Sequence, residues 1–242
     1  MIDFRIPDRE RFLGALSLPA ESSGGIGTLN ERSVHAVLKR YIEPDPAFWE
    51  VPVGRFVADI DDGEVICEIQ TSKIYATAEK LRHFLEFSAV TLVTPQILSR
   101  HIVRVDAETG ETLSRRLSPR RGRREDILGN LVPIASFIAR PELSLWIPFL
   151  DVTDVRLAKE KGKRGEKTDT LPEALVDALY VEKPKDLLAL LPSPLPASFT
   201  VKELALFAKI PPQTAQGAAR LFYELGLFRR EKEGRAFRYF PL

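Results

Sequence analysis

A turn signal, Asp61-Asp62-Gly63, separates two apolar segments and restricts the possible folds more than any other feature of the sequence. Acidic residues followed by glycine between extended segments are typical of a β-hairpin. The expected elements around this turn are strands at 48–53, 55–60 and 64–71, a helix at 74–87 and a strand at 89–94. This order predicts a mixed α/β fold, and the sequence has no GxGxxG or Walker-type loop of the kind that nucleotide-binding domains use.

The neighbouring segments extend this pattern in both directions. Apolar residues recur with a helical period in 29–42. Downstream, the sequence predicts a hairpin around Glu108-Thr109-Gly110 with strands at 101–106 and 112–116, a helix near 125–138, a strand-like run at 143–155 and a charged loop at 159–170.

The chain changes character near residue 182, where several prolines surround a short helix expected at 185–191. Two further helices are expected at 201–208 and 213–225, the second ended by Gly226, and a basic hairpin at 227–240. We therefore divide the chain into an N-terminal arm at 1–28, an α/β domain at 29–181 and a small C-terminal domain at 182–242.

The net charge of +1 conceals an uneven distribution of basic residues. Residues 113–124 contain six arginines and no acid, residues 159–167 carry a net +3, and residues 182–242 a net +4, which leaves −12 for the remainder. A layout of this kind suits a protein with one face for a polyanion. Basic loops that are merely solvated are the alternative.

Other features limit the setting in which the protein acts. The single cysteine, Cys67, excludes an internal disulfide and lies in an apolar run, which favours a buried small hydrophobic residue. No apolar stretch reaches the roughly 20 residues that a membrane span needs. The N-terminal segment is too charged for a signal peptide, so we expect a cytoplasmic protein without membrane contact.

Two acidic residues flank the first hairpin. Side chains alternate along a strand, so Ile66, Glu68 and Gln70 share one face, and a two-residue turn would place Asp59 diagonal to Glu68, about 7–8 Å away. Two carboxylates at that separation can bind one Mg²⁺, which could activate water for phosphodiester hydrolysis. The alternative is that both carboxylates line a solvated strand face.

Asp59 followed by Glu68-Ile69-Gln70 resembles the Asp…Glu-x-Lys signature of the PD-(D/E)xK nuclease superfamily, and the resemblance covers roughly residues 29–106. It implies a restriction-endonuclease-like α/β/α core, dependence on Mg²⁺ or Mn²⁺, and phosphodiester hydrolysis with Asp59 and Glu68 as metal ligands. Gln70 replaces the lysine of the signature and could orient water or phosphate. Lys73 or Lys80 could supply the missing cation, although the sequence favours an ordinary surface role for each of them.

Glu31 resembles the acidic residue that many such nucleases place on their first helix as an additional catalytic and metal-binding residue. The segment from Thr28 to Glu31 also fits a capping box, which would use that carboxylate on the backbone. We keep both interpretations open. His35 and His83 are single histidines on predicted helices, where surface or core roles are more common than catalysis.

Residues 198–242 resemble a winged-helix domain, in which the second helix enters the DNA major groove and the basic hairpin contacts the backbone. We expect Leu204, Phe207, Leu221, Phe222 and Leu225 to form its core. One arginine side chain can donate to two phosphate oxygens at once, so the arginine-rich segment is a second candidate for DNA contact. The phosphates of RNA could bind to this segment equally well. The candidate DNA-binding residues are Arg115, Arg116, Arg120, Arg121, Arg123, Arg124, Gln213, Thr214, Gln216, Arg220, Arg229, Arg230, Lys232, Arg235 and Arg238.

The leading hypothesis is a Mg²⁺-dependent DNA endonuclease, with Asp59, Glu68, Gln70, Glu31 and Lys80 as candidate catalytic residues and duplex DNA as partner. A homodimer or a larger nucleoprotein complex is compatible with this layout. One alternative is a non-catalytic DNA-binding or regulatory protein with a degenerate nuclease fold. Another is a nuclease-like subunit that its C-terminal domain recruits to a larger complex through protein contacts.

Overall fold

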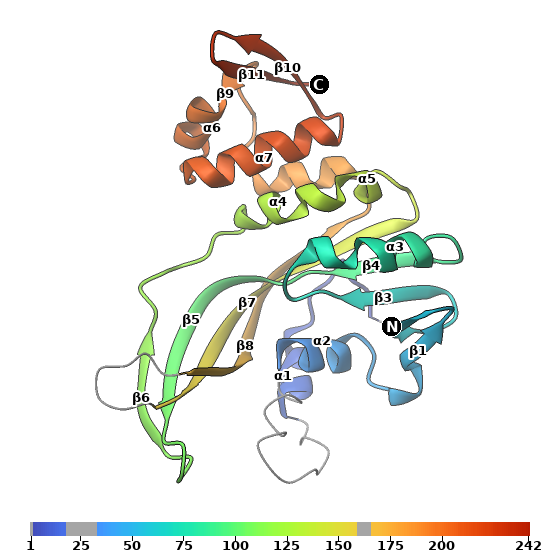
Figure 1. Cartoon of the computed structure of the whole chain (residues 1–242), viewed down its shortest axis with the longest axis vertical. Helices are drawn as coiled ribbons and strands as arrows, with labels where there is room; N and C mark the ends of the chain where they lie inside the picture. Colours follow the sequence, from blue (N-terminus) through green and yellow to red (C-terminus); the bar gives the residue numbers. More distant parts are fainter. Residues whose placement is uncertain (1, 18–32, 159–165) are drawn as a thin grey trace. The chain divides into compact units, whose positions relative to one another are not determined.

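The computed structural model describes residues 2–17, 33–158 and 166–242 (Figure 1). The chain forms two compact units, each built from three separate segments. The first unit contains Met1–Asp62, Pro95–Gly122 and Ile147–Leu179, and the second contains Gly63–Thr94, Arg123–Trp146 and Tyr180–Leu242. Glu31 and the predicted capping box at 28–31 lie outside the described residues.

Two helices of the first unit pack through aromatic side chains. Helix α1 (Arg9–Ser17) contributes Phe12, whose ring meets that of Tyr41 on α2 (Val34–Ile42) edge-on at 5.6 Å between centroids. The Tyr41 hydroxyl also accepts a hydrogen bond of 2.9 Å from the Asp8 backbone N–H. Ser33 caps α2 by accepting from the Ala36 N–H. The predicted helix at 29–42 is thus confirmed from residue 34 onward.

The strands of the first unit pair both parallel and antiparallel. A short 3₁₀ turn, η2 (Pro46–Phe48), leads into β1 (Trp49–Val53), which pairs antiparallel with β2 (Phe56–Asp61). Strand β5 (Gln96–Val105) pairs antiparallel with β6 (Thr112–Leu117) and parallel with β7 (Leu143–Leu157), and β8 (Glu166–Val181) pairs with β7 (Figure 1). These pairings confirm a mixed α/β fold with a mixed sheet.

One predicted strand is confirmed, and one segment predicted as a loop is partly a strand. Arg115 and Arg116 belong to β6, which confirms the strand predicted at 112–116, and the rest of the arginine-rich segment follows after Leu117. Residues 166–170 belong to β8, so the prediction of a charged loop over 159–170 is wrong for this part, and residues 159–165 lie outside the described residues. Pairing with β7 overrides the charged sequence of β8.

The second unit begins with a β-α-β arrangement. Strands β3 (Val65–Ile69) and β4 (Ala89–Val93) are parallel, and η3 (Ile74–Thr77) with α3 (Ala78–Phe84) forms the crossover between them. Strand β4 in turn pairs parallel with the first residues of β7, at Leu143–Trp146. Parallel strands require a crossover of this kind. The core here includes Cys67, which is fully buried as predicted.

A broken helix follows the arginine-rich segment. The predicted helix near 125–138 is confirmed as α4 (Asp126–Leu131), the 3₁₀ turn η4 (Val132–Ile134) and α5 (Ala135–Ile138). Pro133 lacks an N–H donor, which accounts for the interruption. The predicted short helix at 185–191 is a 3₁₀ helix, η5 (Pro184–Leu190).

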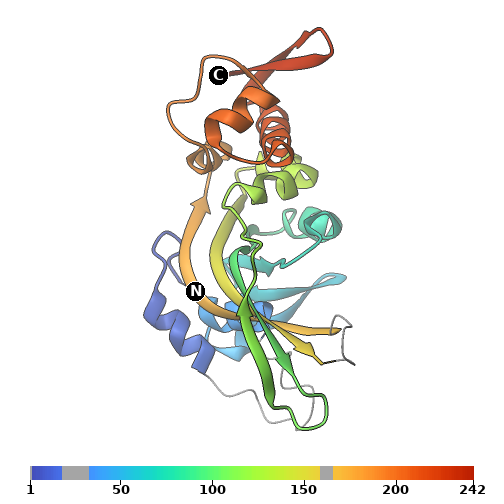
Figure 2. The same cartoon turned by 90° about the vertical axis from the view of Figure 1, so that its left-hand side faces the viewer.

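The C-terminal segment contains β9 (Phe199–Thr200), α6 (Val201–Ala208), α7 (Pro212–Glu224) and the hairpin β10 (Phe228–Glu233) and β11 (Ala236–Pro241). Strand β9 pairs with β11, and the hairpin projects beyond the helices (Figure 2). Phe199, Phe222 and Phe228 pack against one another in its core. Phe207, predicted as core, is 40% exposed because it lies on the outer side of α6, and that prediction is wrong.

Candidate functional site

Glu68 is a buried carboxylate with a cationic partner in the second unit. It lies near the end of β3, between the parallel strand β4 and helix α3, and is only 4% exposed. The Lys80 amino group, from the first turn of α3, donates a hydrogen bond of 2.6 Å to Glu68 Oε1. Charged groups are rarely buried without a partner, so the ion pair explains why both residues are tolerated here.

Gln70 uses its side chain locally. Its backbone N–H donates to the Val93 carbonyl at 2.8 Å, continuing the pairing of β3 with β4, and its side-chain amide donates to the Ser72 carbonyl. The amide oxygen could still accept a hydrogen bond from a water molecule, whereas a phosphate oxygen could only accept one from the amide nitrogen. Lys73, the other lysine that the sequence offers, is exposed and adopts a left-handed backbone conformation at φ 49°.

Asp59 belongs to the first unit, where it contacts a histidine. The His35 Nε2 atom, on the first turn of α2, lies 3.2 Å from Asp59 Oδ2, and the two side chains are 36% and 17% exposed. His35 was expected to have a surface or core role, and its contact with Asp59 was not predicted. The two residues are 24 positions apart, and no spacing in the sequence indicated that α2 and β2 would meet at this point. The joint metal site of Asp59 and Glu68 stays a prediction.

Arg115 takes part in an ion-pair network on the strands of the first unit. Its guanidinium donates to Glu173 Oε1 at 2.7 Å, and the His101 ring lies 2.7 Å from Glu173 Oε2. Burial raises the pKa of Glu173, but the Thr153 hydroxyl and the neighbouring His101 and Arg115 outweigh it and hold the pKa below its ordinary value. Arg115 is therefore a structural partner of Glu173 as well as a candidate for phosphate contact.

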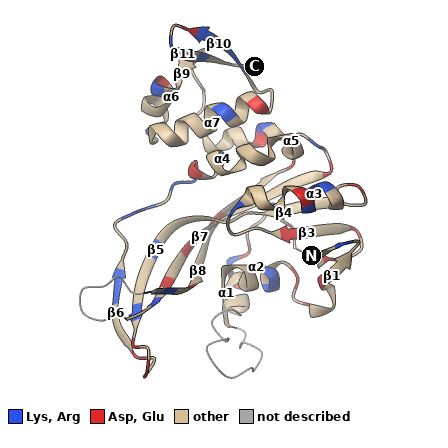
Figure 3. Cartoon of the chain, viewed as in Figure 1, with Lys and Arg blue, Asp and Glu red and all other residues tan. Residues whose placement is uncertain are grey.

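The rest of the arginine-rich segment leads into α4 (Figure 3). Arg120, Arg121 and Arg124 are exposed. The Arg123 guanidinium donates a hydrogen bond of 2.7 Å to the Lys209 carbonyl, in the turn between α6 and α7. The segment thus ends against the C-terminal helices, within the second unit.

Helix α7 exposes three of the four predicted contact residues. Gln213, Gln216 and Arg220 are exposed and follow one another at helical spacing. Thr214 was predicted to lie on the same outward face, but its hydroxyl donates to Asp126 Oδ1 at 2.7 Å, so it faces α4. That prediction is wrong because α4, a segment distant in sequence, covers this side of the helix.

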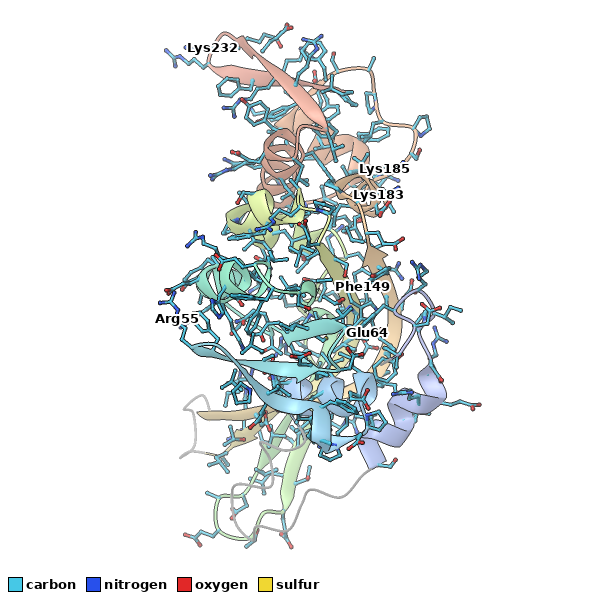
Figure 4. All side chains as sticks on the ribbon, turned by 90° about the vertical axis from the view of Figure 1, so that its right-hand side faces the viewer. Arg55, Glu64, Phe149, Lys183, Lys185 and Lys232 are labelled. Carbon is cyan, nitrogen blue, oxygen red and sulfur yellow. The ribbon has the colours of Figure 1, made fainter. Side chains whose placement is uncertain are left out.

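The hairpin carries basic residues in three different environments. The Arg230 guanidinium lies between the rings of Tyr223 and Phe237, 4.0 and 4.4 Å from their centroids, and Arg229 lies over Phe240 at 3.8 Å. Lys232 and Arg235 are exposed, and Lys232 projects from the hairpin end (Figure 4). Arg238 is bound by two carboxylates and contacts Glu203 at 3.1 Å and Glu233 at 2.6 Å.

One family model matches this chain, over residues 32–182, which is more than half of its length. It describes a domain of unknown function, DUF8091. The chain belongs to the DUF8091 family. A comparison with curated proteins gave no match, and neither did a comparison with solved structures.

The DUF8091 match separates the candidate residues into two groups. Asp59, Glu68, Gln70, Lys80 and the arginine-rich segment lie inside the matched range, whereas α6, α7 and the hairpin follow it. Glu31 immediately precedes it. The matched range ends at residue 182, next to the predicted start of the C-terminal domain.

Two properties of the DUF8091 chain concern ligands and membranes. Within residues 2–17, 33–158 and 166–242, no group of three or more histidine, cysteine, aspartate or glutamate side chains could hold a metal ion. Among the helices of these residues, none has the length and apolar composition that crossing a membrane demands.

Proposed function

We propose that this protein is a metal-dependent DNA endonuclease with a restriction-endonuclease-like core and a C-terminal winged-helix DNA-binding domain. The observation that carries the proposal is the contact between Lys80 and Glu68, 2.6 Å between Nζ and Oε1. In the nuclease signature a lysine places a cation near the scissile phosphate, and Gln70 stands where that lysine is expected. Lys80 provides that cation from α3.

The order of elements supports the nuclease part of the proposal. Helix α2, strands β1, β2 and β3, helix α3 and strand β4 follow one another along the chain, with β3 and β4 parallel. This is the helix–strands–helix–strand order that the resemblance implies. Asp59 and Glu68 lie on the second and third of these strands, as the signature requires.

The donor groups are compatible with a hard divalent cation. Mg²⁺ prefers oxygen ligands and commonly takes only one or two carboxylates from the protein, with waters and phosphate oxygens completing its shell. Glu68 supplies such a carboxylate, and Asp59 is the second ligand predicted by the motif. When bound, the metal would polarise the phosphodiester and acidify a water molecule. In this scheme Lys80 orients the Glu68 carboxylate and stabilises negative charge that develops on the phosphate.

The DNA-binding part rests on the exposed residues of α7 and the hairpin. Gln213, Gln216 and Arg220 form one exposed stripe, and arginine and glutamine side chains are suited to base edges in the major groove. The stacking of Arg230 between two aromatic rings keeps a guanidinium in a fixed orientation at the hairpin.

Cleavage of supercoiled plasmid with Mg²⁺ or Mn²⁺ tests the proposal. We expect nicking or linearisation by the wild type, and a loss of at least a hundredfold in Glu68→Gln and in Lys80→Met, on the order of what a single catalytic group contributes. Lys73→Gln, a change at an exposed lysine, serves as the matched control and should cut like the wild type. Equal cutting by all four proteins would disprove the assignment of Glu68 and Lys80.

A second candidate function is DNA binding without cleavage. The hydrogen bond from the Gln70 amide to the Ser72 carbonyl favours it. The residue at the lysine position of the signature then carries no positive charge, and its amide group is already partly occupied within the chain. Binding of plasmid by the wild type without metal-dependent cutting would support this alternative.

A further inference from the structure

One carboxylate joins the arginine-rich segment to α7. Asp126 Oδ2 accepts a hydrogen bond of 3.0 Å from the Arg123 backbone N–H, and Asp126 Oδ1 accepts one of 2.7 Å from the Thr214 hydroxyl. Asp126 is the first residue of α4 and Thr214 lies in the first turn of α7. The end of the arginine-rich segment and the start of α7 are therefore held by the same side chain.

Two further contacts fix this arrangement. The Arg123 guanidinium donates to the Lys209 carbonyl at 2.7 Å, which ties it to the turn before α7. Helices α4 and α7 cross at two glycines, and a Cβ atom on Gly217 would lie only 2.6 Å from the Gly129 Cα. Backbones in direct contact leave no side chain between the helices that could rearrange, so the position of Arg123 relative to α7 is well defined.

The polar side chains that remain exposed around these contacts are mainly basic or amide-bearing. They are Arg123, Arg124, Lys209, Gln213, Gln216 and Arg220, which we call the clamped surface. The acidic residues in or next to it are Glu224, 3.9 Å from Arg220, and the partly buried Glu125 and Asp126. Four basic side chains with glutamines between them match the phosphates and base edges of a nucleic acid.

We infer that the clamped surface is one continuous contact surface for duplex DNA, and that Asp126 and Thr214 are positioning residues that bring Arg123 and Arg124 to the same DNA segment as α7. This inference rests on the DNA-binding part of the proposed function and is independent of cleavage. It also means that residues 182–242 alone lack part of the surface, because Arg123, Arg124 and the helix α4 that follows them come from residues 123–131.

Binding of the full-length protein to a labelled duplex of mixed sequence, followed by fluorescence anisotropy over a series of salt concentrations, tests the inference. Each lost phosphate contact lowers the slope of log affinity against log salt by about 1. We expect this loss for Arg124→Gln and for Lys209→Gln. Lys185→Gln, a change at an exposed lysine of the same unit, should keep the wild-type slope (Figure 4).

The positioning role is tested by combining Arg124→Gln with Thr214→Val, which removes the hydroxyl but keeps the size of the side chain. In the Thr214→Val background, Arg124→Gln should lower affinity less than it does in the wild type, and Thr214→Ser should restore the full effect. Thermal unfolding of each variant separates a loss of positioning from a loss of folding. If Thr214 acts by positioning, the Thr214→Ser and Thr214→Val proteins are folded to the same extent, but the effect of Arg124→Gln on affinity differs between them.

The outcomes distinguish this inference from the proposed nuclease activity. Wild-type binding with reduced slopes in Arg124→Gln and Lys209→Gln, but without cleavage, supports the clamped surface and overturns only the nuclease. Wild-type binding with unchanged slopes in both variants overturns the clamped surface. No binding of DNA at low salt overturns it too, and favours a protein partner for the C-terminal domain.

Discussion

Lys80 Nζ lies 2.6 Å from Glu68 Oε1, and both side chains are largely withdrawn from water, at 22% and 5% exposure. The pair joins the helix of a β-α-β crossover to the strand that precedes it. An exposed ion pair contributes little to folding, but a buried carboxylate that loses its cation is costly. The contact therefore has a consequence for stability that does not depend on any catalytic role.

Lys80→Met should lower the free energy of unfolding by about 2–4 kcal/mol, because it removes the cation next to the buried Glu68 carboxylate. Urea denaturation at neutral pH measures this. The double variant Glu68→Gln with Lys80→Met should be more stable than Lys80→Met alone, since the buried charge is then absent. A change below about 0.5 kcal/mol in Lys80→Met would show that the pair behaves as a surface ion pair.

Gly217→Ala should destabilise the contact between α4 and α7. The added Cβ would lie 2.6 Å from the Gly129 Cα, which is backbone and cannot rotate away, so the helices must separate. We expect a loss of about 1–3 kcal/mol in the free energy of unfolding. Gly14→Ala in α1 is the matched control, because no atom lies within 4 Å of its added Cβ, and it should be neutral or stabilising by up to about 1 kcal/mol. Similar effects of the two changes would contradict the close crossing.

Features that depend on local sequence were predicted well. The start of α6 is one example, where Thr200 and Glu203 form a capping box, and Gly226 after α7 adopts the expected left-handed conformation at φ 70°. The helix after β3 is another. In each case neighbouring residues determine the backbone conformation, so distant parts of the chain are not needed.

Features that depend on distant contacts were not predictable. Strand β8 contains Pro172 and several charged residues, which argue against a strand until the partner β7 is known. Thr214 was expected to face outward because helical spacing alone cannot show that α4 covers that side. The contact of His35 with Asp59 likewise joins two elements whose meeting no spacing indicates. Lys80, in contrast, was one of two lysines that the sequence offered as a cation for this motif, and it contacts Glu68.

Asp154 should make the first unit less stable in acid. Burial raises the pKa of this carboxyl, but the Thr170 hydroxyl and the charges of Arg100 and Lys167 outweigh burial and hold the pKa below its ordinary value of 3.8. A carboxyl with a lowered pKa in the folded state stabilises the fold above its unfolded pKa, and this stability is lost as the pH falls through the folded value. Thermal unfolding from pH 7 down to pH 2 should show the loss below about pH 4.

Asp154→Asn should therefore be less stable than the wild type at pH 7 and lose less stability on acidification. Asp169 of the neighbouring strand is the matched control, because burial outweighs its hydrogen bond to the Thr170 N–H and raises its pKa. That carboxyl opposes folding once the pH exceeds its unfolded pKa, so Asp169→Asn should gain stability at pH 7. Parallel pH profiles for the wild type and Asp154→Asn would contradict the assigned role of Asp154.

The two basic residues Lys232 and Arg238 should differ in their effect on DNA binding although they lie on the same hairpin. Lys232 projects from the hairpin end, whereas Arg238 contacts Glu233 and Glu203, which already neutralise its charge (Figure 4). Lys232→Gln should lower the salt slope of DNA binding by about 1, as expected for one lost phosphate contact. Arg238→Gln should keep the wild-type slope and instead lower the thermal unfolding midpoint, because it releases the two carboxylates that hold β11 to α6 and β10. A lower slope for Arg238→Gln with an unchanged slope for Lys232→Gln would show that DNA contacts the side of the hairpin and not its end.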